Sequence, residues 1–309
     1  MSVDILPQFV QSHLENNEKV ILILMDCLRV DQLKAMADQL SQVFHLKTEF
    51  CLSVLPTATP YSRNAIFSGY FPLELQKKYP DIWSKMWKNE NSMNQFEEQF
   101  LKDYLIRNGL GSKSIHYHKI VNYDQGNRLA NRIKEYKGID ILALVVNFVD
   151  ILGHSRSDSN ILQEMVPNES AYRKAICAWL ENAWLIDVLK EISSWGYMVF
   201  ITSDHGSTQV TKPVQIKGDK ETSTGIRYKY GRNLNLPRKA GVRINDTTSY
   251  LLPDHGLNTD YIISKGRHYF VYPNDYHRFA TKYQNSFQHG GISLEEMIIP
   301  MVTMKGKNL

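Results

Sequence analysis

The sequence lacks three features that would place the protein in a membrane or in an oxidising compartment. None of its uninterrupted apolar runs approaches the ~18 residues of a membrane-spanning helix. The first residues, Met1 to Gln11, contain no basic region ahead of an apolar one, so we expect no secretory signal. The only cysteines are Cys27, Cys51 and Cys177, and they show no paired spacing. We interpret them as reduced core residues of a cytoplasmic protein.

The sequence does contain enough apolar material for one sizeable domain. It has 309 residues, of which 43% are hydrophobic. Strand-like and helix-like segments alternate, which predicts an α/β fold with a mostly parallel central sheet and helices on both faces. We expect a single domain over residues 1–309, with a core of residues 1–207 and 289–309. The region 208–288 is rich in Gly, Thr, Lys and Tyr, and we interpret it as an insertion that binds substrate.

Periodicity and terminal signals place the expected elements of this core. The expected helices cover residues 4–17, 30–43, 60–68, 92–107, 124–137 and 169–194. Asn168 is the expected N-cap of the last of these helices, and Gly196 ends it. The expected strands cover residues 19–25, 48–54, 114–121, 139–148, 197–203, 241–244, 261–264, 269–272 and 297–304.

Three of the apolar strand-like runs are each followed by an aspartate: Asp26, Asp150 and Asp204. Because ligands of an open α/β sheet lie outside the carboxyl ends of its strands, we expect these carboxylates at one edge of the sheet. Several buried carboxylates in one place are costly unless something positive lies between them. Histidines accompany them at His154, His205 and His289. The pattern predicts a site for two metal ions.

A hydroxyl-bearing segment follows the second expected strand. Pro60 suits the first position of the helix 60–68, which leaves Thr59 at the N-cap. A helix N-terminus stabilises negative charge and offers N–H groups to a phosphate. A hydroxyl placed there beside a metal can act as a nucleophile. Thr57 competes with Thr59 for this role, and we favour Thr59 because it directly precedes the helix.

Taken in order, the motifs resemble those of the alkaline phosphatase superfamily. They are the strand-end Asp26, the threonine before the helix, D-x-x-x-H at 150–154, S-D-H-G at 203–206 and H-G-G at 289–291. The residues around Asp26 and Pro60 resemble the PglZ branch, and more closely the C-terminal output domain of PorX-type response regulators of the type IX secretion system. That resemblance implies a receiver domain upstream, which this chain does not contain, and regulatory partners in type IX secretion.

The resemblance also implies the ligands and the chemistry. One metal takes Asp150, His154 and His289, and the other takes Asp26, Asp204 and His205 with Thr59 as its reactive ligand. Carboxylate oxygens and imidazole nitrogens suit two Zn²⁺ ions, with Mn²⁺ as the alternative. Sulfatases of the superfamily need a cysteine or serine, so threonine disfavours sulfate esters. We expect Thr59 to attack phosphorus, giving a covalent phosphothreonine that water hydrolyses.

The insertion bears on the substrate. The segment from Ser207 to Arg243 contains nine basic and two acidic residues, and its net charge of +7 suggests an anionic partner. Positive charge follows phosphates and aromatic rings stack on bases, so we predict a phosphodiesterase of short or cyclic oligonucleotides. The alternatives are a partner-binding regulatory module with structural metals and a phosphomonoesterase or phosphomutase-like enzyme. The predicted substrate-binding residues are Arg63, Asn64, Arg227, Tyr228, Lys229, Tyr230 and Arg232.

Overall fold

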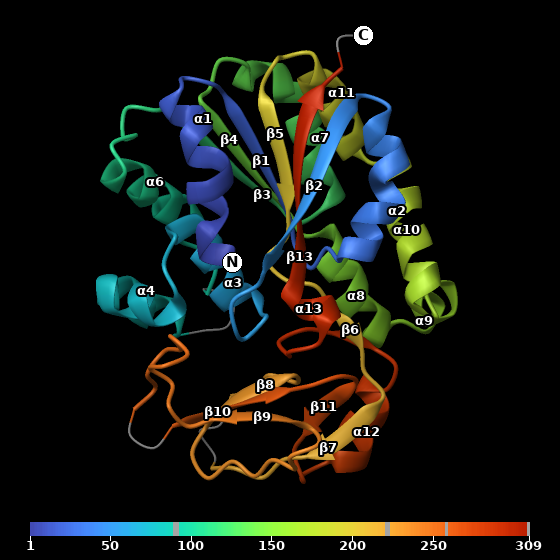
Figure 1. The fold of residues 1–309 in the computed structure, drawn as a ribbon. Coiled ribbons are helices and arrows are strands. Elements are labelled where there is room, and N and C mark those ends of the chain that lie inside the picture. Colours follow the sequence, from blue (N-terminus) through green and yellow to red (C-terminus); the bar gives the residue numbers. More distant parts are fainter. Residues whose placement is uncertain (89–92, 220–222, 257–258, 308–309) are drawn as a thin grey trace.

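A six-stranded sheet forms the centre of the computed structural model, which describes residues 1–88, 93–219, 223–256 and 259–307. Its strand order is β2-β13-β5-β1-β4-β3 (Figure 1). The strands are β1 (Val20–Met25), β2 (Phe44–Leu52), β3 (Ile115–Ile120), β4 (Ile141–Val146), β5 (Met198–Thr202) and β13 (Ile298–Gly306). The strand β13 runs antiparallel to both of its neighbours, and the other strand pairs of this sheet are parallel, which confirms the predicted mostly parallel architecture.

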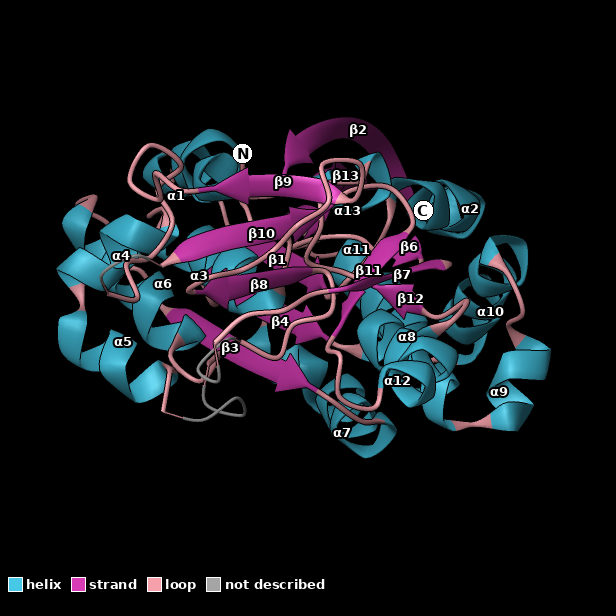
Figure 2. Ribbon diagram, turned by 90° about the horizontal axis from the view of Figure 1, so that it is seen from below, coloured by secondary structure: helices cyan, strands magenta, loops and turns pink. Residues whose placement is uncertain are grey.

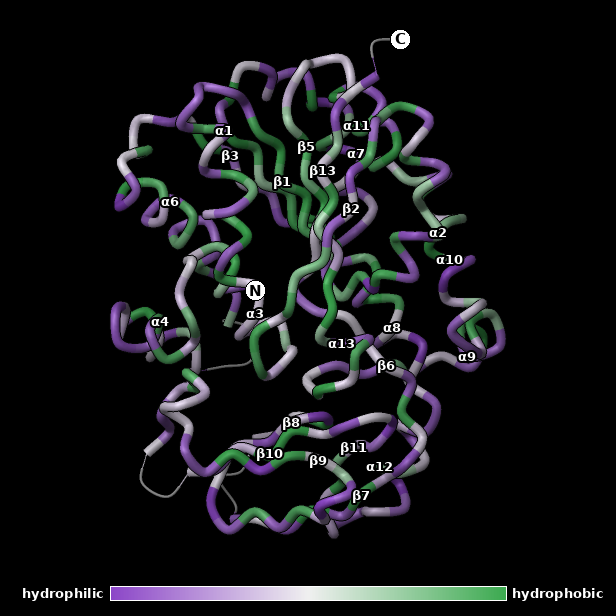
Figure 3. Tube along the Cα trace, viewed as in Figure 1, coloured by the Kyte–Doolittle hydropathy of each residue, from purple (hydrophilic) through white to green (hydrophobic). Residues whose placement is uncertain are grey.

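The two faces of the sheet are covered by separate helical layers. In β1, Ile21 and Ile23 face one layer while Leu22 and Leu24 face the other, because side chains alternate along a strand. Every residue of β1 and β4 and the last four of β5 are buried, as expected for strands covered on both faces. The central strands are accordingly coloured as hydrophobic in Figure 3. No described helix has the length and apolarity needed to cross a bilayer.

The helices divide between these layers according to the apolar cluster they join. The first layer contains α2 (Val30–Ser41), α7 (Tyr123–Arg132), η4 (Ile133–Tyr136), α10 (Glu169–Asn182) and α11 (Trp184–Ser193). The second contains η2 (Leu6–Val10), α1 (Gln11–Glu15), α3 (Thr59–Ser68), α4 (Pro72–Lys78), α5 (Pro80–Met86) and α6 (Glu97–Arg107). The short η1 (Ser2–Asp4) precedes them, and α8 (Phe148–Asp158) and α9 (Asn160–Met165) follow β4.

The inserted region lies across the carboxyl ends of the parallel strands (Figures 1 and 2). It contains β6 (Thr208–Gln209), β7 (Lys212–Gln215), β8 (Tyr228–Gly231), β9 (Gly241–Ile244), β10 (Asp260–Ser264), β11 (His268–Val271), α12 (Tyr276–Tyr283) and β12 (Phe287–Gln288), and α13 (Leu294–Met297) follows it. The antiparallel sheet β8-β10-β9 is its centre. Tyr61 and Ala65 of α3 share an apolar cluster with Tyr261 and Ile263 of β10, which anchors the insertion to the core.

Several predicted elements need correction. The helix expected over residues 169–194 is broken at Ala183, whose backbone is extended. Ala183, Trp184 and Leu185 are all buried, and three consecutive residues cannot share one buried stripe of a straight helix. The predicted N-cap Asn168 is confirmed, since its side chain accepts a hydrogen bond from the N–H of Ala171.

Two further boundaries differ. Asp150 does not follow a strand directly: β4 ends at Val146, and Asp150 lies in the first turn of α8. Ser92, the expected start of a helix, lies outside the described residues, and α6 begins at Glu97. The helices α4 and α5 were not predicted, although each begins at a proline.

Candidate metal centre

The carboxyl ends of three parallel strands deliver the predicted carboxylates to one edge of the sheet. Asp26 directly follows β1, and Asp204 lies two residues after the end of β5. Asp150 follows β4 through the first turn of α8, and His154 lies one turn further along the same helix. Residues four apart share one face of a helix, so Asp150 and His154 point the same way.

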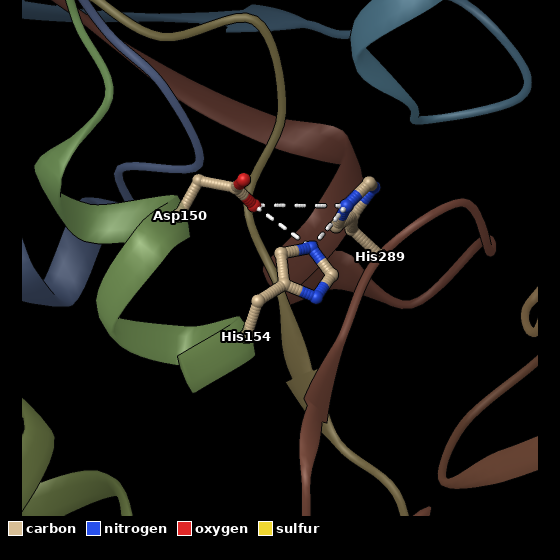
Figure 4. Close-up of side chains that lie close together, drawn as sticks. All are labelled: Asp150, His154 and His289. Atoms are coloured by element: carbon tan, nitrogen blue, oxygen red, sulfur yellow. Dashed lines mark hydrogen bonds and ion pairs between the residues drawn. The ribbon is translucent and has the colours of Figure 1, made fainter. Parts of the chain in front are cut away.

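The first candidate group contains Asp150, His154 and His289 (Figure 4). The Nε2 atom of His154 lies 3.2 Å from Oδ1 of Asp150 and 3.2 Å from Nε2 of His289. The Nε2 atom of His289 lies 3.7 Å from the same carboxylate oxygen. His289 is followed by Gly290, whose φ of +111° and contact with the Tyr228 ring leave no room for a larger residue.

The second group contains Asp26, Asp204 and His205, all of them buried. Nε2 of His205 lies 3.9 Å from Oδ1 of Asp26 and 3.7 Å from Oδ2 of Asp204. The Nδ1–H of His205 donates to the carbonyl oxygen of Gly206 at 3.1 Å, because a carbonyl can only accept. In the neutral ring Nε2 then carries the lone pair and faces both carboxylates, and this is the tautomer that binds a metal.

Both groups fit a metal ion. Two ligands that each bind zinc at about 2.0–2.1 Å lie about 3.3 Å apart in tetrahedral geometry, close to the separations found here. Within the described residues, Oδ1 of Asp26 and Oδ2 of Asp204 are buried and have no hydrogen-bond partner. These two atoms face Nε2 of His205, so the three donors point at a common position. Buried polar atoms without partners are rare and point to a missing ion or ligand.

The electrostatics of the two groups also suit a cation. Burial and the nearby charge of Asp204 raise the pKa of Asp26 well above its ordinary value, although Arg63 opposes this shift. Burial and the neighbouring His205 hold the pKa of His289 well below its ordinary value, so its imidazole is neutral. Burial disfavours ionisation of Asp150, but the hydrogen bond and charge of His154 outweigh it and lower the pKa of Asp150. The imidazoles of His205 and His289 stack with centroids 4.2 Å apart, so the groups are neighbours.

A buried ion-pair network supports the second group from behind. Arg63 of α3 donates from Nη1 to Oδ2 of Asp26 at 2.7 Å and from Nε to Oε1 of Glu97 at 2.5 Å. Glu97 also accepts from the hydroxyl of Tyr117, and Lys119 lies 3.6 Å away. The network leaves Oδ1 of Asp26 directed at the metal position. Arg63 was predicted to contact substrate, and this is wrong because its guanidinium is buried between two carboxylates.

The two threonines that competed for the nucleophile's place occupy different positions. Thr59 lies at the edge of the second group, with its Oγ1 3.0 Å from Nε2 of His205. Thr57 is fully buried, donates to the carbonyl of Gly291 at 2.7 Å and accepts from the N–H of Gly290. Thr59 is the first residue of α3 rather than its N-cap, which is Ala58. Its hydroxyl therefore faces the metal position.

A large cavity opens in front of the first group and Thr59. Its volume is about 880 Å³, and its walls include Thr59, Asp150, His154 and His289. Ligand pockets are commonly about 300–1,000 Å³, so this cavity can hold more than a single phosphate. Trp87, Tyr228 and Tyr230 form an aromatic wall, in which Trp87 and Tyr230 meet edge to face with centroids 5.9 Å apart.

The basic and aromatic residues of β8 do not act together as predicted. Side chains alternate along a strand, so Tyr228 and Tyr230 line the cavity, while Lys229 of the same strand and Arg227 just before it are buried away from the cavity. Arg227 is fully buried and pairs with Glu296, which also accepts the N–H of Gly291. Arg227 therefore supports the loop that carries His289, and Lys229 lies over the Tyr272 ring. The prediction that these two residues bind substrate is wrong.

The remaining predicted contacts also lie away from the cavity. Asn64 is buried, and its Nδ2 donates to the carbonyls of Pro60 and Met93. Arg232 is half exposed and lies 3.4 Å from Asp219. Sequence reasoning missed Trp87 and Glu97, because neither belongs to a recognisable motif: Trp87 is the C-cap that follows α5, and Glu97 begins α6.

Comparisons with known proteins identify the family of the chain. A search of curated protein sequences found no significant match. Among solved structures, phosphonoacetate hydrolase from Sinorhizobium meliloti 1021, in complex with phosphonoformate, superposes with a TM-score of 0.59 at 10% identity, covering 93% of this chain and 90% of that one. Murine ectonucleotide pyrophosphatase/phosphodiesterase 5, as an inactive threonine-to-alanine variant in complex with AMP, gives a TM-score of 0.59 at 13% identity, with 93% and 88% covered.

A second structure of the murine protein gives a TM-score of 0.54 at 13% identity, covering 94% of this chain and 88% of that one. These likenesses show an alkaline phosphatase-like fold. The family model for the BREX system PglZ alkaline phosphatase-like domain matches residues 5–304, so the chain belongs to the PglZ family.

Proposed function

We propose that this protein is a two-metal phosphodiesterase whose nucleophile is Thr59. The observation that carries the proposal is the position of the Thr59 hydroxyl, 3.0 Å from the ring nitrogen of His205 that faces Asp26 and Asp204. An ion held by Asp26, Asp204 and His205 would therefore meet this hydroxyl as well. A metal site with a purely structural role would not need an alcohol at its open side.

The two groups divide the work between the entering and the leaving oxygen. Asp150, His154 and His289 would hold the second ion. We propose Zn²⁺ at both sites, with Mn²⁺ as the alternative, because the donors are carboxylate oxygens and imidazole nitrogens. Bound metals supply charge stabilisation for oxygens at phosphorus and lower the pKa of a hydroxyl or a water molecule.

The reaction then proceeds in two displacements. Oγ1 of Thr59 forms a bond to phosphorus while the bond to one ester oxygen breaks, and the leaving oxygen takes up a proton as its alcohol departs. The covalent phosphothreonine still carries the second ester group. Water attacks the same phosphorus, the bond to Oγ1 breaks, and a phosphomonoester is released with the Thr59 hydroxyl restored. The partly buried position of Thr59 at the start of α3 places it where a helix dipole favours the developing negative charge.

The cavity supports a substrate larger than a simple monoester. Its aromatic wall of Trp87, Tyr228 and Tyr230 offers ring faces and edges for bases, and its volume leaves room for more than one nucleotide unit. The similar murine fold was solved with AMP. We propose short or cyclic oligonucleotides as substrates. Arg227 and Lys229 do not line the cavity, and among the described residues its lysine and arginine lining consists of Lys88 and Lys282.

The direct test compares bis-p-nitrophenyl phosphate with p-nitrophenyl phosphate, with and without chelator. The proposal expects a preference for the diester, loss of turnover with chelator, and loss in Thr59→Ala with the bound metal retained. Thr59→Ser is the matched control, since it keeps the hydroxyl. Wild-type turnover in Thr59→Ala, or a preference for the monoester, would contradict the proposal. Hydrolysis that survives full metal removal would contradict the role of the metals.

We also propose how the activity is regulated and where in the cell it occurs. The residues around Asp26 and Pro60 resemble output domains of PorX-type response regulators, and we propose that a receiver domain controls the activity in a type IX secretion pathway. The three cysteines form no disulfide. That state agrees with a reducing compartment, so we propose a cytoplasmic location.

A further inference from the structure

The strand β2 forms an edge of the central sheet, because β13 is the one strand with which it pairs in the described structure. It is nine residues long and pairs with β13 in continuous register, without a bulge. It contains no proline or glycine. Natural proteins protect an edge strand by making it short, by bulging it, by placing proline in it or by placing charged side chains, lysine above all, along it. The first three protections are not present in β2, and its charged side chains Lys47 and Glu49 are of opposite sign, so they can pair with a second copy of the strand.

The hydrogen bonds at both ends of the ladder show which backbone groups point outward. The N–H of Ser53 donates to the carbonyl of Met297, and the N–H of Lys307 donates to the carbonyl of Val43. Antiparallel ladders bond alternate residues, so the odd-numbered residues of β2 bond to β13. The N–H and C=O groups of the even-numbered residues face away from the sheet, and no described residue bonds to them. These are Phe44, Leu46, Thr48, Phe50 and Leu52.

The side chains on this edge are unusually apolar. Phe50 is 60% exposed and Leu52 is 45% exposed. Beside them lies a groove of about 290 Å³ between α2 and β2, walled mainly by apolar side chains that include Leu33, Leu40 and Leu46. A dry apolar cavity of about 150 Å³ accepts a benzene ring, so this groove has room for a phenyl side chain.

We propose that β2 pairs antiparallel with β2 of a second copy of this chain, with Thr48 at the twofold axis. In this register Lys47 lies opposite Glu49 of the second copy, and Leu46 lies opposite Phe50 of the second copy. Sliding the strands by two residues either way keeps the hydrogen bonds but places Lys47 opposite Lys47 or Glu49 opposite Glu49 of the second copy, and a slide by one residue leaves the outward N–H and C=O groups unmatched. Only the Thr48 register matches charge and hydrogen bonds together.

The same register explains the groove and the exposed phenyl ring. Leu46 lines the groove, so Phe50 of the second copy, lying opposite Leu46, enters it. The twofold axis repeats each contact, as in any isologous dimer. Lys47 and Glu49 already pair within one chain at 2.9 Å and are 73% and 41% exposed, so both can also face the second copy.

The test measures the oligomeric state by sedimentation velocity over a range of protein concentrations. Wild type should form a dimer. Lys47→Glu places like charges opposite each other twice, and we expect the dimer dissociation constant to rise at least about tenfold. Glu49→Lys should act in the same way. The double exchange Lys47→Glu with Glu49→Lys should restore dimerisation, and an equimolar mixture of the two single variants should form a heterodimer.

Backbone pairing is tested separately with Thr48→Pro and its control Thr48→Ala. Proline removes an outward N–H that β13 does not use, so the monomer should fold and keep wild-type activity while the dimer is lost. Alanine keeps the N–H and should leave the dimer intact. A wild-type protein that stays monomeric at high concentration would overturn the proposal. So would a dimer that is insensitive to both the charge reversals and the proline.

Discussion

Replacing Arg63 with methionine should destabilise the protein strongly. Arg63, Asp26 and Glu97 have side chains at most 2% exposed, and the two ion pairs have N–O distances of 2.7 and 2.5 Å. Methionine removes the one cation that touches both carboxylates. Removing one partner from a buried pair costs about 3–5 kcal/mol, because it leaves a buried charge without compensation. Typical domains have a free energy of unfolding of about 5–15 kcal/mol, so a large part of the stability is at risk.

The measurement is urea unfolding of chelator-treated protein. The matched control is Arg132→Met, which removes an arginine–carboxylate pair of the same 2.7 Å distance from the exposed surface. We expect the control to unfold at nearly the wild-type urea concentration, because exposed ion pairs contribute little. If Arg63→Met were as stable as this control, the buried network would not support Asp26 and the reasoning would fail. Glu97→Gln in the Arg63→Met background should cost less than Glu97→Gln alone, because the two residues share one interaction.

Three other predictions follow from the site and the insertion. Asp150→Asn and Asp204→Asn should each lower bound zinc from about two to about one equivalent per chain, and unchanged metal content in either would contradict the ligand assignment. Burial lowers the pKa of Lys229 from 10.5 to about 7, so between these values the unfolded chain binds more protons and the free energy of unfolding rises with pH. This rise is at most about 1.4 kcal/mol per pH unit, and Lys229→Met should abolish it. If the variant and the wild type showed the same dependence of the free energy of unfolding on pH, the burial argument would be refuted. Trp87→Ala should raise KM for a dinucleotide, since one stacked base contributes about 1–3 kcal/mol, and an unchanged KM would remove Trp87 from the substrate site.

The ligands of the candidate metal centre could be predicted because parallel sheets impose a simple rule. Strand-end residues of different strands meet at one edge of the sheet, so Asp26 and Asp204 converge. The N–H of Cys27, next to Asp26, donates to Asp204 although the two residues are 177 positions apart in the sequence. Asp150 and His154 converge through the four-residue spacing of a helix face. Both rules depend on local periodicity and sheet order, which the sequence pattern carries.

The substrate side of the cavity could not be predicted for an equally physical reason. The alternation of basic and aromatic residues over 227–232 was interpreted as one mixed surface, but in a strand it separates two faces. Which face lies inward depends on Glu296, the distant partner that neutralises Arg227. The break at Ala183 likewise depends on Trp184 packing against Gly126 of another helix. Long-range partners of this kind leave no local signal.

The charge balance around Asp26 gives a reason why a divalent ion belongs in the buried group. Asp26, Asp204 and Glu97 bring three carboxylates to a region where their side chains are at most 2% exposed, and Arg63 brings one cation. Lys119 lies 3.6 Å from Glu97 and offsets a second of these charges. Burial and the nearby charge of Asp204 then raise the pKa of Asp26 well above its ordinary value. A divalent cation would offset the charge of Asp26 and Asp204 and satisfy the unpartnered oxygens of both, whereas a water molecule would supply no charge.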